Sequence, residues 1–197
     1  SLNDVERKKI ETRIADLIAQ AWHTEEIRSV RPTPVDEARW GFSVIENSLW
    51  EAVPDFMREL DGRLNEDYEV SLPLDASPVQ FSSWMGGDRD GNPFVTSKVT
   101  EQVLLLARKR AAKLFAIDLD RLQVELSMYD CNDALREKVG DANEPYRALL
   151  RPLVDKFIAT RDGISDYLAG KNPDTSNWVE SDDELIEPLM LCYQSLL

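Results

Sequence analysis

The chain has 197 residues, 43% of them hydrophobic, a formal net charge of −14 at pH 7, a pI near 4.5 and a mean hydropathy of −0.39. This length and hydrophobic content suit one domain, or one domain with an appendage. The acidic balance argues against a nucleic-acid-binding protein, which needs a basic face. No apolar run is long enough to predict a membrane span.

Two helices are predicted before residue 65. Apolar residues at spacings of three and four predict the first helix, from about Asp4 to Trp22. Thr33 is a suitable N-cap for a second helix that begins at Pro34 and runs to about Leu64. Because a proline inside a helix cannot donate an amide hydrogen, we expect a kink at Pro54. Residues 1–64 are therefore predicted to form a helical hairpin.

The segment from 65 to 96 is the part of the chain with the weakest helical pattern. Residues 65–78 are polar and contain prolines, which predicts a loop. From Val79 to Trp84, apolar and aromatic residues alternate with Gln and Ser, which predicts a strand. One strand cannot pair its own backbone, so it is expected to be an orphan strand at the edge of a helical body. A glycine-rich loop follows.

Helical patterns return from 97 to 197. Thr96 is expected to cap a long helix from Ser97 to about Tyr129, and a short helix follows over 132–140 with Gly140 at its end. A further helix is predicted from Glu144 to Leu168, and a last one after a cap at Ser181 or Asp182. The two cysteines, Cys131 and Cys192, are far apart in apolar helical contexts. We interpret both as buried thiols with no disulfide or metal.

The glycine-rich loop, FSSWMGGDRDGNPFVT at residues 81–96, combines conformationally special and chemically active residues. Gly86 and Gly87 allow backbone angles that other residues avoid, and Gly91 before Asn92 and Pro93 predicts a second turn. A backbone folded this tightly, next to a helix N-terminus, can present amides to a phosphate or carboxylate.

A purely structural turn is an equally good interpretation of this loop. In that case Asp88 and Asp90 would cap backbone amides, and Arg89 would pair with a neighbouring acid. A calcium loop is excluded by spacing. Counted from Asp88, the glycine is fourth where an EF-hand needs it sixth, and Val99 stands where the bidentate Glu is needed.

Several motifs together resemble phosphoenolpyruvate carboxylase of the bacterial and plant type. They are SWMGGDRDGNP in the glycine-rich loop, WHTEEIR (22–28), RPTPVDEARWG (31–41), ENSLWEAVP (46–54), ELSM (125–128) and EPLMLCYQSL (187–196). The resemblance runs over nearly the whole chain. It implies a mainly α, helical bundle-like fragment that resembles part of a (β/α)₈ barrel enzyme with many added helices. The chain lacks an initiator Met and stops inside a helical pattern, so we expect an internal fragment of the N-terminal half, α-rich over 1–197.

The resemblance also implies a function. Enzymes of this family carboxylate phosphoenolpyruvate with bicarbonate to give oxaloacetate and phosphate, using Mg²⁺ or Mn²⁺. Their catalytic histidine belongs to a TAHPTE motif that does not occur here, and no metal ligand of the family falls on this chain. The resemblance implies substrate-pocket or supporting roles for Trp84, Met85, Gly86, Gly87, Asp88, Arg89, Asp90 and Asn92. The tryptophan would help form an apolar pocket near the methylene carbon of the substrate.

The family further implies a cytoplasmic homotetramer. The isolated chain is expected to be inactive, to hold no metal, and to self-associate through apolar faces. His23 is the one histidine, and it is expected to meet the last carbonyls of the first helix. Phe94 stands where some plant members carry an arginine for a sugar-phosphate activator, so that activator site is not expected.

Two alternatives stay open from the residues alone. The chain could be a non-enzymatic helical binding or scaffold module whose glycine-rich turn holds an anionic ligand. Trp84 could also be an ordinary core residue, since a tryptophan at an apolar position of a strand is commonly buried.

Overall fold

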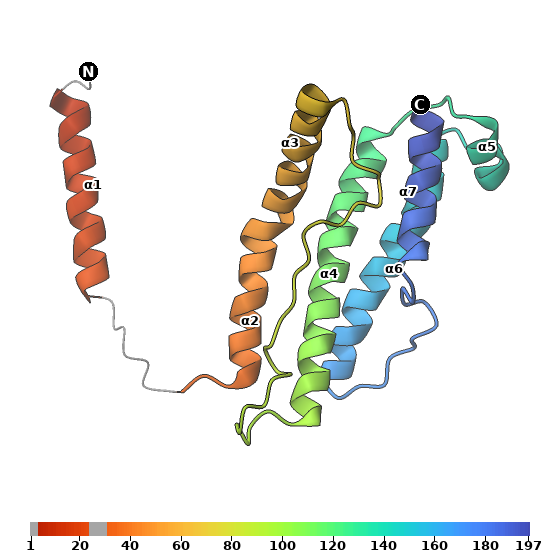
Figure 1. The fold of residues 1–197 in the computed structure, drawn as a ribbon. Coiled ribbons are helices and arrows are strands. Elements are labelled where there is room, and N and C mark those ends of the chain that lie inside the picture. The colour runs from red at the N-terminus through yellow and green to blue at the C-terminus, as the bar shows by residue number, and fades with distance from the viewer. Residues whose placement is uncertain (1–3, 24–30) are drawn as a thin grey trace. The chain divides into compact units, whose positions relative to one another are not determined.

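The computed structural model describes residues 4–23 and 31–197. The chain divides into two compact units, Ser1–Pro32 and Thr33–Leu197. Helices and irregular segments make up both units (Figure 1). No described helix is both long and apolar enough to span a membrane.

The first unit contains α1, Asp4–His23. The predicted helix from Asp4 to Trp22 is confirmed. Its first turn contains the acidic residues Asp4 and Glu6, whose negative charges interact favourably with the positive end of the helix dipole. Arg7 and Glu11 form an ion pair of 3.0 Å along its surface. The side chain of His23 and residues 24–30 lie outside the described residues, so the expectation for His23 and the helical hairpin of 1–64 stay predictions.

The second unit begins with three consecutive helical segments. They are α2 (Pro34–Val44), the π-helical segment η1 (Ile45–Leu49) and α3 (Trp50–Tyr68). Thr33 caps α2 as predicted: its hydroxyl accepts the amide of Asp36, and the carboxylate of Asp36 accepts the amide of Thr33. This reciprocal pairing satisfies two backbone donors that the first helical turn leaves free.

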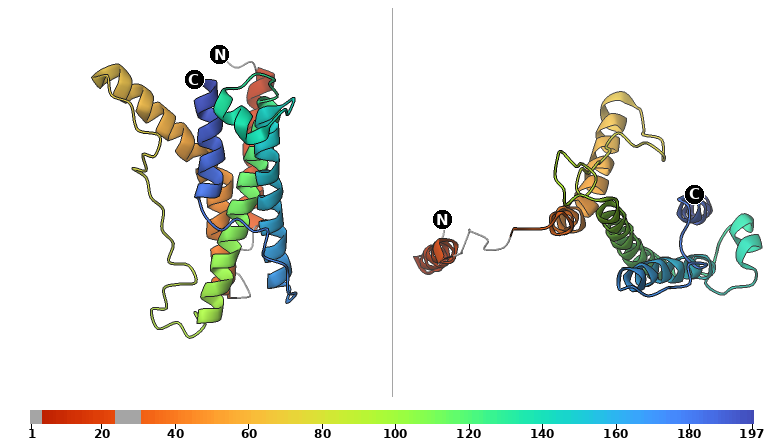
Figure 2. Two further views of the ribbon diagram at one scale, coloured as in Figure 1. Left: turned by 90° about the vertical axis from the view of Figure 1, so that its right-hand side faces the viewer. Right: turned by 90° about the horizontal axis from the view of Figure 1, so that it is seen from below.

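The predicted kink lies one turn before Pro54 instead of at it. In η1 the amide of Trp50 donates to the carbonyl of Ile45, five residues back. The ring of Pro54 conflicts with the carbonyl four residues earlier, that of Trp50, so the irregular geometry falls on the preceding turn. Figure 2 shows the axis of α3 turned away from that of α2.

The predicted strand is not seen. Val79 to Trp84 is extended and irregular, and no strand occurs among residues 4–23 and 31–197. A strand needs a neighbour for its backbone hydrogen bonds, and none of the other described segments supplies one. Residues 69–96 instead form one irregular connection from the end of α3 to the start of α4 (Figure 1).

The main core lies between the helices that follow. These are α4 (Ser97–Glu125), α5 (Asp133–Val139), α6 (Pro145–Leu168) and α7 (Asp183–Leu196). α4 and α6 lie side by side in Figures 1 and 2. Leu135, Tyr146 and Leu150 of the main core cluster are fully buried, and each large apolar side chain removed from water stabilises the fold by about 1.5–3 kcal/mol.

Most of the predicted helix ends in this region are confirmed. Thr96 caps α4 by accepting the amide of Val99 at 3.3 Å, and Gly140 ends α5 with a φ of 65°. The long helix ends earlier than predicted, at Glu125 and not near Tyr129. The chain must turn there so that α6 can run back along α4, with α5 packed against α6 and α7.

The cysteines are free thiols, as predicted. Cys192 is buried in the main core, whereas Cys131 is only half-buried. Burial raises the pKa of the Cys192 thiol to about 11, because a thiolate is disfavoured away from water.

Candidate functional site

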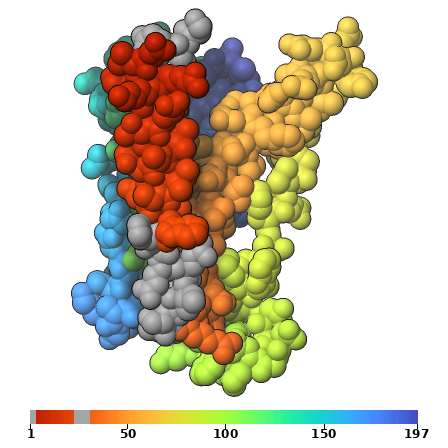
Figure 3. Space-filling model, turned by 90° about the vertical axis from the view of Figure 1, so that its left-hand side faces the viewer, coloured from red at the N-terminus to blue at the C-terminus, as the bar shows by residue number. Residues whose placement is uncertain are grey.

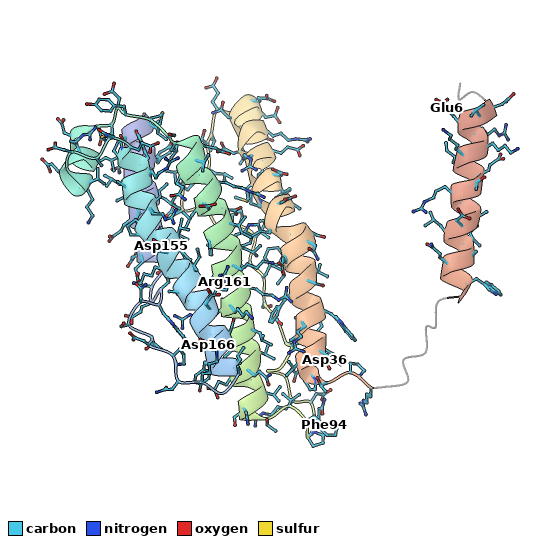
Figure 4. All side chains as sticks on the ribbon, turned by 180° about the vertical axis from the view of Figure 1, so that it is seen from behind. Glu6, Asp36, Phe94, Asp155, Arg161 and Asp166 are labelled. Atoms are coloured by element: carbon cyan, nitrogen blue, oxygen red, sulfur yellow. The ribbon has the colours of Figure 1, made fainter. Side chains whose placement is uncertain are left out.

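The glycine-rich loop, residues 81–96, lies at the start of α4. Figure 4 shows Phe94 at the outer end of this loop, close to the first turn of α4, and its side chain is 65% exposed. Val95 is buried beside it, and Thr96 then caps the helix. The loop is thus joined to a 29-residue helix through a capped first turn.

Met85 and Gly86 form the inner side of the loop. A Cβ on Gly86 would lie 2.6 Å from Cγ2 of Val103, and a Cβ on Gly41 would lie 2.3 Å from Cε of Met85. Gly86 also has a φ of 71°, which residues with a side chain rarely adopt. Met85 therefore packs on α2 and Gly86 packs on α4, and the positive φ of Gly86 together with the branched side chain of Val103 leaves no room for a larger residue at Gly86.

Val103 belongs to a small core cluster with Val35, Ala38 and Phe42 of α2, and Met85 packs against this cluster. This is a second apolar centre, separate from the main core between α4 and α6. The glycine-rich loop is thereby held against both α2 and α4.

Hydrogen bonds within the loop use several of its backbone amides. Gly87 and Asp88 both donate to the carbonyl of Trp84, at 3.0 and 2.9 Å. Asn92 donates to the carbonyl of Arg89 at 2.5 Å, and the amide of Phe94 donates to Oδ1 of Asn92 at 3.0 Å. These amides are not available to an anion, which weakens the case for an anion site made of loop backbone. A side-chain cap comes from Asn92, where Asp88 and Asp90 were the predicted caps.

The remaining candidate side chains lie on the outer side of the loop. Trp84 is 75% exposed, so it is not a core residue of the described chain. Asp88, Arg89, Asp90 and Asn92 are exposed as well. The eight predicted site residues therefore separate into an anchored pair, Met85 and Gly86, and an outward group that includes the tryptophan and the charged residues.

An open hollow of about 500 Å³ lies between Arg89 and the first turns of α4. Its rim includes Thr100, Glu101 and Arg108. Glu101 accepts the Tyr167 hydroxyl at 3.0 Å, which raises the pKa of that tyrosine, and Arg108 donates to the carbonyl of Val179 at 2.5 Å. The hydroxyl of Thr100 donates to the carbonyl of Gly86, so all three polar groups join α4 to other parts of the unit.

Sequence reasoning missed the residues that hold the loop. Thr100, Val103 and Gly41 come from α4 and α2, and in the sequence each looks like an ordinary helical residue. A signal was present, since a glycine within an amphipathic helix commonly marks a close approach. The partner across that approach could not be read from the sequence.

A polar cluster joins η1 to α4. Glu46 pairs with both Arg110 and Lys113, and its side chain is 17% exposed. The hydrogen bond from Lys113 is the main cause that lowers the pKa of Glu46, with Arg110 adding to it and partial burial opposing it. Nearby, Nε1 of Trp50 donates to the carboxylate of Asp118 at 2.7 Å.

An apolar groove of about 420 Å³ lies next to this polar cluster. Its lining comes from η1, the start of α3, Phe81 of the loop and Phe115 of α4. Figure 3 shows α3 projecting from the second unit, with residues 69–96 exposed along the same side. The apolar side chains of Phe56 on α3 and Phe81 in the loop are both exposed.

A divalent metal does not fit the described residues as a resident ion. Among residues 4–22 and 31–197, no three His, Cys, Asp or Glu side chains come together in a way that could hold one. Asp88 and Asp90 by themselves supply too few oxygen ligands for Mg²⁺ or Mn²⁺, which take about six.

Comparisons with known proteins agree on one family. The family model described as phosphoenolpyruvate carboxylase matches residues 1–197. Proteins named phosphoenolpyruvate carboxylase from Aeromonas hydrophila and Pseudomonas putida are 57% and 56% identical to this chain over 191 and 195 residues. One from Tolumonas auensis is 54% identical over 191 residues. The matches cover 97–99% of this chain but only 22% of each relative's length.

Proposed function

This chain belongs to the phosphoenolpyruvate carboxylase family, and we propose from that premise that it is one segment of an enzyme that carboxylates phosphoenolpyruvate. The reaction joins bicarbonate to the substrate and releases oxaloacetate and phosphate. The chain spans about 22% of the length of the curated relatives that it matches, so the rest of the machinery would come from other segments.

The glycine-rich loop is the contribution of this segment to the substrate pocket. The main support for this proposal is that Trp84 is 75% exposed, on a loop whose inner residues pack against two helices. An indole held outward in this way is free to form one wall of a pocket completed by other parts of the enzyme. An apolar wall suits the reaction, because an enolate formed after phosphoryl transfer is protonated in water.

The other loop residues support this wall. Met85 and Gly86 anchor the loop, and the amides of Gly87 and Asp88 fix the carbonyl of Trp84. The exposed side chains of Asp88, Arg89, Asp90 and Asn92 would orient charged groups from the completing segments. Their roles stand on the family resemblance and on their common exposure.

The isolated chain should not catalyse the reaction. Phosphoryl transfer to bicarbonate needs cations around the transferred phosphate and a base for the bicarbonate proton. The described residues offer no cluster of side chains that could hold a metal ion. The purified chain, incubated with phosphoenolpyruvate, bicarbonate and Mg²⁺, is expected to form no oxaloacetate, and turnover by it would contradict this proposal.

The role of Trp84 is tested in the full-length protein that contains this segment. Trp84→Ala should lower kcat by about tenfold or more, because water then enters the pocket. Phe94→Ala is the matched control, since it removes another exposed aromatic side chain from the same loop. Thermal unfolding of both variants should stay close to that of the parent protein. Unchanged turnover in Trp84→Ala would favour a helical binding or scaffold module over an enzyme segment.

Further properties follow from the family and are part of the same proposal. The full-length protein would use Mg²⁺ or Mn²⁺, act in the cytoplasm and form a homotetramer. The isolated chain would self-associate through the groove near Phe81 and the apolar side of α3. Sedimentation of the isolated chain at rising concentration should show dimers or larger species, and a monomer throughout would rule out that association.

A further inference from the structure

The side-chain hydroxyl of Thr100 lies within hydrogen-bond distance of two carbonyl oxygens, one of them in the glycine-rich loop. Thr100 lies in the first turn of α4, and its hydroxyl is 2.6 Å from the carbonyl oxygen of Gly86 and 3.2 Å from that of Thr96. A helical threonine ordinarily donates to the carbonyl four residues back, which here is that of Thr96. The shorter contact goes to the glycine-rich loop, 14 residues away in sequence.

Two apolar contacts flank this hydrogen bond. One turn along α4, Val103 packs on Gly86, and on the other side Met85 packs on Gly41 of α2. The hydrogen bond and both contacts therefore act on adjacent residues, Met85 and Gly86. We call the Thr100 hydroxyl and the Gly86 carbonyl the loop latch.

The loop latch is directly connected to the outward side chains. Trp84 precedes Met85, and its carbonyl accepts two amides, those of Gly87 and Asp88. The peptide groups from 84 to 88 thus form one hydrogen-bonded turn with Gly86 inside it. A change in the position of the Gly86 carbonyl would turn Trp84 and Arg89 together.

We propose that Thr100 is a positioning residue, whose hydroxyl sets the orientation of Trp84 through the carbonyl of Gly86. This inference rests on the proposed function, since it gives the loop the task of lining a substrate pocket. Thr100 itself does not reach the reacting atoms. It acts by selecting one conformation of the turn at residues 84–88.

The alternative acceptor makes the loop latch easy to open. When the Gly86 carbonyl moves away, the Thr100 hydroxyl can still donate to the carbonyl of Thr96, so α4 keeps a satisfied side chain. Loss of the hydroxyl should therefore loosen the loop and leave the helix intact. This separates a positioning role from a role in the stability of α4.

The first test measures amide hydrogen exchange in the full-length protein. In Thr100→Val, amides of residues 85–88 should exchange about fivefold faster, as expected for the loss of one intramolecular hydrogen bond. Thr100→Ser keeps the hydroxyl and should exchange like the parent protein. Thr12→Val is the matched control, because Thr12 also donates to a carbonyl four residues back, that of Lys8, but belongs to the other unit. Unchanged loop exchange in Thr100→Val would overturn the proposal.

The second test measures turnover of the same variants. Thr100→Val should lower kcat about fivefold, the loss expected for one intramolecular hydrogen bond, with a smaller change in KM, and Thr100→Ser should restore most of the loss. A Ser variant as slow as the Val variant would assign the effect to packing and overturn the hydroxyl's role, as would faster loop exchange without any loss of kcat. If the parent full-length protein shows no carboxylase activity, the proposed function fails, whereas the exchange experiment still decides whether the loop latch exists.

Discussion

Helix α6 and the glycine-rich loop both pack against α4, but they differ in how fully this chain buries their side chains. Between α4 and α6, large apolar side chains such as Leu150 and Tyr146 are fully buried by residues of this chain. In the loop, Met85 and Gly86 are held inside, while Trp84 and the charged residues face solvent.

The difference separates residues that maintain the fold from exposed residues, to which the proposed function assigns contacts outside this segment. A core side chain finds its contacts within the chain, so its removal changes the free energy of unfolding. An exposed tryptophan on an anchored loop contributes little to that free energy. It stays in a fixed place where another segment or a substrate can contact it, and this is how binding residues are commonly arranged on loops.

The largest expected effect on the free energy of unfolding comes from a substitution in the main core. Leu150→Ala should lower the free energy of unfolding by about 2–5 kcal/mol, because it leaves a cavity where a side chain with no exposed surface was packed. Leu104→Ala is the control on α4, since Leu104 is 65% exposed, and it should change that free energy by less than about 0.5 kcal/mol. Urea denaturation measures both. Equal losses would mean that the main core does not lie between α4 and α6.

A smaller effect is expected where the loop meets the helices. Gly86→Ala should cost about 1–3 kcal/mol, because Gly86 has a φ of 71° and its new Cβ would meet Val103 at 2.6 Å. Gly87→Ala is the neighbouring control: its nearest contact would be the carbonyl oxygen of Trp84 at 3.8 Å, an ordinary distance. Thermal and urea unfolding of the two variants should differ clearly. A Gly87→Ala loss as large as that of Gly86→Ala would show that the loop is anchored elsewhere.

The smallest effect concerns the ion pairs between η1 and α4, and it depends on pH. The pKa of Glu46 is lowered from its ordinary value of 4.5, so the carboxylate is favoured in the folded state. Its stabilising contribution is complete above the unfolded pKa and is lost as the pH falls through the lowered folded pKa. Glu46→Gln should therefore cost about 1 kcal/mol at pH 7, a modest value because Lys113 is 47% exposed.

The difference between the parent and Glu46→Gln proteins should stay constant from about pH 8 to pH 6 and shrink below about pH 4.5. Urea denaturation at a series of pH values follows it. Glu51→Gln, which removes an exposed carboxylate from the first turn of α3, is the control, and at pH 7 it should cost less than Glu46→Gln. A difference that grows as the pH falls would contradict the assigned direction of the pKa change.

The helices and their ends were largely predictable because their signals are local. The threonines at 33 and 96 and Gly140 act within one helical turn, so their capping roles could be read directly from the sequence. The predicted strand at 79–84 failed for the opposite reason. Its alternating pattern is a local signal, but a strand exists only when another segment pairs with it, and none of the described segments does.

The sequence indicated where the candidate site lies, but it did not indicate which of the loop residues are anchored and which face outward. The eight loop residues form one motif, and the sequence contains nothing that separates Met85 and Gly86 from Trp84 and Arg89. The contacts with Gly41, Thr100 and Val103 make that separation. The amides of Gly87 and Asp88, which looked available for an anion, are bonded to Trp84 because the turn closes on itself.

The sequence by itself therefore determined the family, the helical character and the position of the glycine-rich loop. The reason is that motifs, periodicity and caps involve residues close together in the chain. The tertiary structure decided which loop residues are anchored and which face outward. That choice depends on contacts between α2, α4 and the loop, over separations as long as that between Gly41 and Met85, and packing at such separations is settled only when the chain folds.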